Sequence, residues 1–167
     1  MLVLFKKIDF INDKIIQFFK YIASLLLVVV GLLILSDVVL RGVFNKPLIG
    51  VPEIIANLVV IIAFFQFAYA VSIESMLRSD FTIEIAGPKL KKILDIFSCF
   101  LGLLFFALLA MSSYSSMIKS FISSEFEGHA SFRFPTFPLK ATIFLFSSLT
   151  AFTYLLLILS KIFNLKK

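Results

Sequence analysis

The chain has 167 residues, of which 60% are hydrophobic, and it carries a formal net charge of +6 at pH 7. A soluble domain of this length rarely holds so much apolar side chain, because its own surface must stay mostly polar. The composition excludes an ordinary soluble protein and favours a membrane protein. The positive charge then needs no nucleic-acid partner, since lysine and arginine commonly set membrane topology.

Long stretches without charged residues divide the chain. They cover residues 21–36, 54–73, 96–118 and 141–160. A helix needs about 20 apolar residues to cross a hydrocarbon core of about 30 Å, and apolar neighbours on both sides extend the first stretch to that length. Such continuous runs do not alternate as barrel strands do, and a helix satisfies its own backbone in lipid. We therefore predict an all-α integral membrane protein with four transmembrane helices. The prediction is a single membrane domain, 1–167, with spans at about 18–40, 53–73, 93–118 and 139–162.

The segment before the first span has an amphipathic pattern. Apolar residues recur at helical spacing between charged ones, at Leu4, Ile8, Ile11, Ile15 and Phe18. This pattern predicts an amphipathic N-terminal helix. It fits a helix that lies in the membrane interface and docks on a partner, and it fits equally the start of a long first helix.

The distribution of lysine and arginine predicts the orientation. With four spans, the N-terminal segment, the second loop and the C-terminal tail share one compartment, and they hold most of these residues. Positively charged loops remain on the cytoplasmic side. We therefore expect both termini to be cytoplasmic.

The residues that carry most catalytic or metal chemistry are scarce. His129 is the only histidine and Cys99 the only cysteine, so no pair of imidazoles or thiolates can hold a haem or a metal ion. No glycine-rich phosphate loop or nucleophile elbow occurs. We expect no enzyme, no cofactor and no metal site.

Few polar residues fall in or beside the spans. Asp37 and Arg41 are four residues apart and can pair on one helix face, either as a helix-end pair or as a contact to a partner. Serine and threonine in the third and fourth spans favour close helix packing over a pore. Examples are Ser112, Ser115, Ser147, Thr150 and Thr153.

Three loop segments then resemble a known family in their order along the chain. They are RGVFNKPL at 41–48 followed by PEI at 52–54, FAYA at 67–70 leading to RSDFTIE at 78–84, and FPTFP at 134–138. Together they resemble the small membrane subunit (DctQ-like, Q subunit) of tripartite ATP-independent periplasmic (TRAP) transporters. Asp80 stands where this family usually has histidine, and Glu84 where it usually has aspartate.

The resemblance implies a non-catalytic scaffold in a bacterial inner membrane, crossing it several times. Its partners would be membrane lipid, a large DctM-like membrane subunit, and a periplasmic substrate-binding protein that delivers an organic acid. The large subunit would take up that acid by symport, with sodium as the coupling ion. Residues implied in partner contact or loop structure are Asp37, Arg41, Asn45, Glu53, Arg78, Asp80 and Glu84.

Two other functions are compatible with parts of the sequence. The serine-rich third span would suit a stand-alone small oligomeric channel or exporter, although no ring of charges or repeated half accompanies it. A membrane enzyme would have to use an acidic pair such as Asp80 and Glu84, which stand at helical spacing beside a span, and Arg78 neutralises part of that pair.

Overall fold

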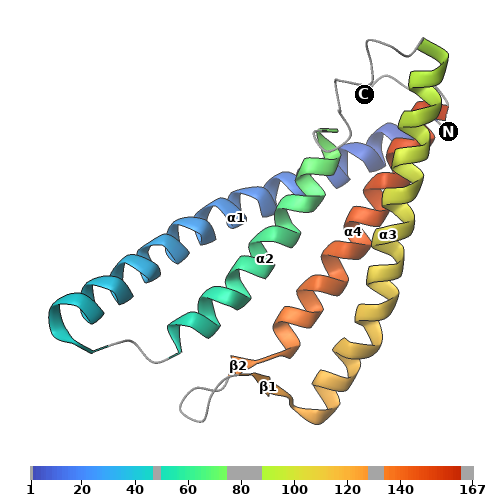
Figure 1. Cartoon of the computed structure of the whole chain (residues 1–167). Coiled ribbons are helices and arrows are strands. Elements are labelled where there is room, and N and C mark those ends of the chain that lie inside the picture. The colour runs from blue at the N-terminus through green and yellow to red at the C-terminus, as the bar shows by residue number, and fades with distance from the viewer. Residues whose placement is uncertain (1, 47–49, 75–87, 128–133, 163–167) are drawn as a thin grey trace.

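A computed structural model of the chain describes residues 2–46, 50–74, 88–127 and 134–162. Two short strands pair antiparallel between the third and fourth helices, with Phe126 opposite Pro135. The elements are α1 (Leu2–Phe44), α2 (Val51–Ser72), α3 (Pro88–Ser123), β1 (Phe126–Glu127), β2 (Phe134–Pro135) and α4 (Phe137–Ile162) (Figure 1). Four of these are helices long and apolar enough to cross a membrane, which confirms the predicted all-α fold for the described part of the chain.

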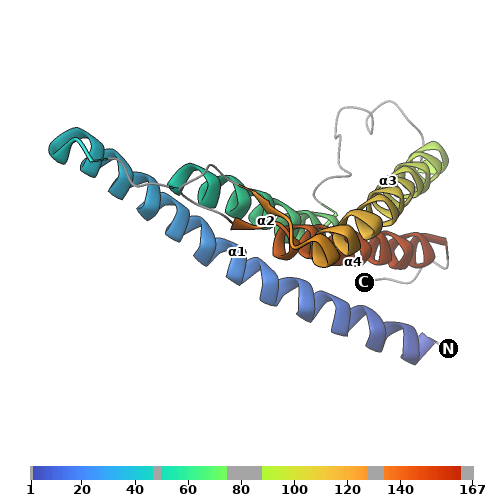
Figure 2. The ribbon, with the colours of Figure 1, turned by 90° about the horizontal axis from the view of Figure 1, so that it is seen from below.

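Helix α1 includes the amphipathic segment and the first span in one unbroken helix of 43 residues. The N-terminal residues therefore begin a long first helix, which decides between the two structures that the pattern allowed. At 1.5 Å per residue α1 is about 64 Å long, about twice the hydrocarbon core. It crosses the other helices obliquely, as two perpendicular views show (Figures 1 and 2).

The turn between α1 and α2 begins and ends with residues in the left-handed conformation. Asn45 has φ 52° and Gly50 has φ 85°. Beyond Asn45, the backbone N–H of Lys46 donates to the carbonyl oxygen of Leu40 at 3.3 Å, which closes the end of α1. Pro52 then lies in the first turn of α2, where its missing N–H costs no hydrogen bond.

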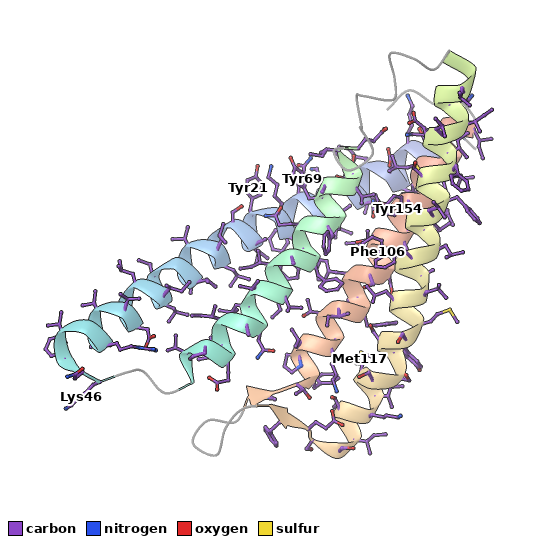
Figure 3. The ribbon with its side chains drawn as sticks, in the orientation of Figure 1. Tyr21, Lys46, Tyr69, Phe106, Met117 and Tyr154 are labelled. Carbon is purple, nitrogen blue, oxygen red and sulfur yellow. The ribbon has the colours of Figure 1, made fainter. Side chains whose placement is uncertain are left out.

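Helices α3 and α4 pack closely along most of their length. Phe106 and Tyr154 stack between them with ring centroids 6.0 Å apart (Figure 3). Gly102 lies against the outer end of the Tyr154 ring, where a Cβ atom would come within 2.6 Å of Cε1. The absence of a side chain at Gly102 therefore sets how closely the two helices approach.

A second apolar cluster joins α1, α2 and α4. The ring of Phe146 lies 4.2 Å from that of Phe65 and 4.7 Å from that of Phe19, measured between centroids. Ala23 and Val30 of α1 are buried beside these rings. Helices α2 and α4 therefore form the centre of the bundle, with α1 and α3 on either side.

The outer faces of α1 and α3 are covered by large apolar side chains. Leu32 of α1 and Leu108 of α3 are each 58% exposed, and Met111 is 74% exposed. Such a surface is unfavourable in water and favourable in the hydrocarbon of a bilayer.

Candidate functional site

The first two predicted residues form an ion pair near the end of α1. A guanidinium nitrogen of Arg41 lies 2.6 Å from a carboxylate oxygen of Asp37, and the pair spans one helical turn. The Arg41 side chain is 59% exposed and that of Asp37 is 13% exposed. The pair can hold its own charge balance and still present the guanidinium to a neighbouring molecule.

Asn45 and Glu53 lie at helix ends. Asn45 has the positive φ that stops α1, a conformation that asparagine tolerates better than most residues. Glu53 lies in the first turn of α2, where a carboxylate is favoured by the helix dipole. The side-chain amide of Asn57 donates to the Glu53 carbonyl oxygen at 2.8 Å. Both residues thus have a local structural role beside the predicted contact role.

The remaining predicted residues, Arg78, Asp80 and Glu84, lie outside the residues that the structure describes, as does His129. Their proposed roles stay predictions.

The structure shows a set of polar contacts that the sequence did not reveal, at the end of the bundle where α1 begins and α4 ends. The ammonium group of Lys161 lies 3.1 Å from a Glu74 carboxylate oxygen and 3.8 Å from one of Asp95. These residues stand at the end of α2, the start of α3 and the end of α4, so a single lysine joins three helices.

Helix α1 is tied to the same end. The side-chain amide of Asn12 donates to the Thr153 hydroxyl at 3.1 Å in a buried position. The ammonium group of Lys20 donates to the Tyr69 hydroxyl at 3.1 Å and lies 4.3 Å from the centroid of the Tyr69 ring. Asn12 continues the line of buried residues on α1, and a polar residue in that line is a signal that could have been read. We call the contacts of this end the terminal brace: Asn12–Thr153, Lys20–Tyr69 and Lys161 with Glu74 and Asp95.

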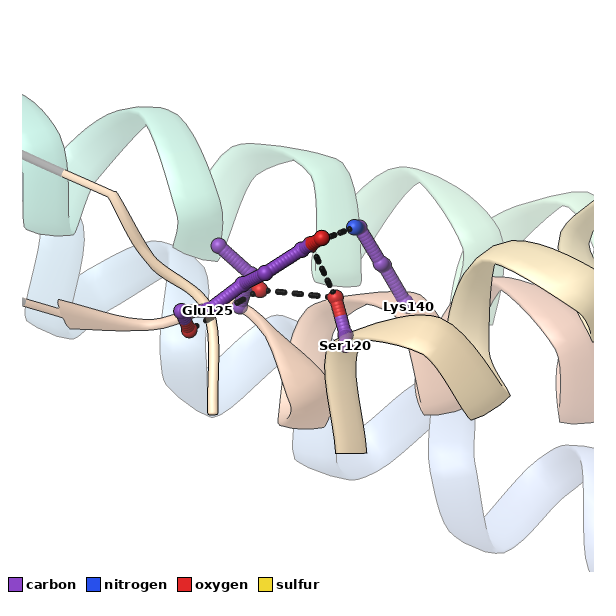
Figure 4. A network of polar contacts seen from close by, with 4 residues as sticks. Ser120, Glu125 and Lys140 are labelled. Atoms are coloured by element: carbon purple, nitrogen blue, oxygen red, sulfur yellow. Dashed lines mark hydrogen bonds and ion pairs between the residues drawn. The ribbon is translucent and has the colours of Figure 1, made fainter. Parts of the chain in front are cut away.

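A second network lies at the opposite end, beside β1 and β2. The Glu125 carboxylate accepts a hydrogen bond from Lys140 at 2.6 Å and one from the Ser120 hydroxyl at 2.7 Å (Figure 4). The Thr136 hydroxyl donates to the Glu125 carbonyl oxygen at 3.1 Å. The hydrogen bond from Lys140, followed by that from Ser120, holds the pKa of the Glu125 carboxyl below its ordinary value. We call these four residues the hairpin brace; they join the end of α3 to the start of α4.

These contacts are arranged to hold helices together. In the described part of the chain, no group of three or more His, Cys, Asp or Glu side chains is placed to bind a metal ion. Ser147, Thr150 and Thr153 are buried in α4, as packing residues would be, whereas Ser112 and Ser115 are exposed on α3. The two braces lie at the two ends of the bundle, with apolar packing between them.

Comparison with known protein families then identifies a match over most of the chain. The family model described as "Tripartite ATP-independent periplasmic transporters, DctQ component" matches residues 17–164. Comparisons with curated proteins and with solved structures gave no match.

Proposed function

The chain belongs to the DctQ component family of tripartite ATP-independent periplasmic transporters, and from this premise we propose that it is the scaffold that holds a large transport subunit in place. The large subunit would move substrate and ion across the membrane. This chain would move neither and would have no catalytic role.

The observation that supports a scaffold is the bracing at both ends of the bundle. The terminal brace ties all four helices, because Lys20 joins α1 to α2, Asn12 joins α1 to α4, and Lys161 joins α2, α3 and α4. The hairpin brace ties α3 to α4 at the other end. A subunit that must stay still while its partner moves benefits from such fixed ends, because a bundle tied at both ends resists shear between its helices.

We propose the following setting for this scaffold. The spans predicted from the charge-free stretches lie in a bacterial inner membrane as one domain, with both termini in the cytoplasm. The large subunit takes up an organic acid together with sodium, and a periplasmic binding protein delivers the acid. On this view Asp37, Arg41, Asn45 and Glu53 face the periplasmic side and the segment with Arg78, Asp80 and Glu84 faces the cytoplasm. Their contact with the partner is part of the proposal.

Reconstituted transport tests the proposal. The large subunit and the binding protein should support sodium-dependent uptake of substrate into proteoliposomes only when this chain is present. The large subunit should also co-purify with this chain in mild detergent. Uptake at the same rate without the chain would refute the scaffold role.

A control separates a scaffold from a channel. The chain alone, reconstituted in a planar bilayer, should give no ion current above that of protein-free bilayers. A steady conductance from the chain alone would favour the stand-alone channel.

A further inference from the structure

A groove of about 500 Å³ runs along the outer surface between α3 and α4. Its walls are mostly apolar, and small side chains supply much of the surface, at Ala107, Ala110 and Ala151. The rings of Tyr114 and Phe144, with centroids 5.6 Å apart, lie toward the hairpin end of the groove. We call this feature the α3–α4 groove; its volume lies within the roughly 300–1,000 Å³ typical of ligand pockets.

The groove has two side-chain hydroxyls, on Tyr114 and Ser148, and is otherwise apolar. Its one aliphatic hydroxyl, on Ser148, already donates to the Phe144 carbonyl oxygen at 2.8 Å. The groove is open along its side. The Met111 side chain in its wall and the neighbouring Leu108 side chain are both largely exposed. An apolar groove of this kind at membrane depth suits a hydrocarbon chain.

The groove also has a defined depth relative to charged residues. At 1.5 Å per residue, Tyr114 lies about 8 Å and Ala107 about 18 Å along α3 from Lys119. If Lys119 lies at the headgroups, the groove occupies the acyl region of one leaflet, whose hydrocarbon is about 15 Å deep.

The charges beyond the groove are complementary to a phosphate. Lys140 lies one helical turn before Phe144, and the exposed Lys119 lies one turn before the end of α3. Lys140 is paired with Glu125, and Lys119 acts on the same carboxylate. Among the side chains that the structure describes at this end, this one carboxylate faces two ammonium groups. We propose that the α3–α4 groove binds one acyl chain of an anionic phospholipid of the surrounding leaflet, with its phosphate at Lys119 and Lys140. This inference requires only that the chain spans a membrane, so it stands or fails separately from the scaffold role.

Native mass spectrometry of the purified full-length chain tests the proposal. The wild-type chain is incubated separately with phosphatidylglycerol and with phosphatidylcholine. It should retain about fivefold more of the first lipid than of the second, because one cationic side chain near an anionic lipid surface has an effect of about that size. Ala107→Phe should fill the groove and lose most of this lipid. Leu108→Phe adds an aromatic ring to the neighbouring exposed position and should retain the lipid as the wild type does. Equal retention of the two lipids by the wild type, or undiminished retention by Ala107→Phe, would overturn the proposal.

A fluorescence measurement avoids filling the groove. The chain contains no tryptophan, so Tyr114→Trp places a single tryptophan at the groove, and Phe105→Trp places one on an exposed position outside it. Brominated phosphatidylglycerol should quench the Tyr114→Trp variant more than brominated phosphatidylcholine does, whereas the two lipids should quench the Phe105→Trp variant equally. Equal quenching by the two lipids in both variants would contradict a specific site. Loss of large-subunit co-purification in Ala107→Phe, with lipid retention unchanged, would assign the groove to a partner helix and overturn the proposal.

Discussion

Replacing Gly102 with alanine tests whether the approach of α3 to α4 depends on a missing side chain. A Cβ at this position would lie 2.6 Å from Cε1 and 2.9 Å from Cε2 of Tyr154. Carbon atoms in good contact are about 3.5–4.0 Å apart, so the ring or the helix must shift by about 1 Å. Tyr154 is buried and stacked on Phe106, which leaves the ring little room to move.

The magnitude follows from a comparison with a second glycine. Gly31 lies in α1, and a Cβ added there would meet no atom within 4 Å. Both Gly→Ala changes gain the same helix propensity, about 1 kcal/mol, and only Gly102→Ala incurs overpacking, which costs about 1–3 kcal/mol. Gly102→Ala should therefore be less stable than Gly31→Ala by about 1–3 kcal/mol.

Unfolding of the detergent-solubilised chain by SDS titration, followed by circular dichroism, measures this difference. The double variant Gly102→Ala/Tyr154→Val removes the overlapping ring. Gly102→Ala should therefore lower the free energy of unfolding less in the Tyr154→Val background than in the wild type. The reasoning fails if Gly102→Ala matches Gly31→Ala in stability, or if Tyr154→Val brings no such rescue.

The two braces give three more predictions. Thr153→Val leaves the buried Asn12 amide without its partner and should lower the free energy of unfolding by about 1 kcal/mol, whereas in an Asn12→Ala background the same change should cost less. Lys161→Met should lower the free energy of unfolding, measured by SDS titration, by up to about 1 kcal/mol, because two carboxylates lose a partly buried cation. A variant more stable than the wild type would show that the contact is unfavourable. The pKa of Glu125 is lower in the folded chain than in the unfolded one, so its stabilising contribution is present above its ordinary value of 4.5 and is lost as the pH falls through the folded pKa. Lowering the pH from neutral to acidic should therefore reduce the melting temperature more in the wild type than in Glu125→Gln. An equal reduction in the two proteins would exclude the Glu125 carboxylate as the source of the pH dependence.

The sequence predicted features that depend on residues close together in the chain. Charge-free stretches are long enough to mark four helices without knowledge of their packing. The spacing of Asp37 and Arg41 predicted that they can pair, and the structure shows an ion pair there. Asn45 ends α1 through its own backbone conformation, so the loop segment that resembles the family lies at a locally determined turn.

Contacts between distant residues could not be derived in this way. Asn12 and Thr153 are 141 residues apart, and their meeting depends on the angle at which α1 crosses α4. That angle is set by many apolar contacts together, of which Phe19 on Phe146 is one. The pattern of residues 1–20 left open whether α1 was one helix or two, because apolar spacing repeats in the same way on both sides of a possible break.

The length of α1 also has a consequence for the lipid around it. A helix that is longer than the bilayer is thick either leans or extends beyond the hydrocarbon, and the amount of lean depends on the thickness of the bilayer. Lipids with longer acyl chains would decrease the tilt of α1 from the bilayer normal, and lipids with shorter acyl chains would increase it. Since Asn12 and Lys20 fasten α1 to the other helices, a change in the tilt of α1 would act as a torque on the whole bundle.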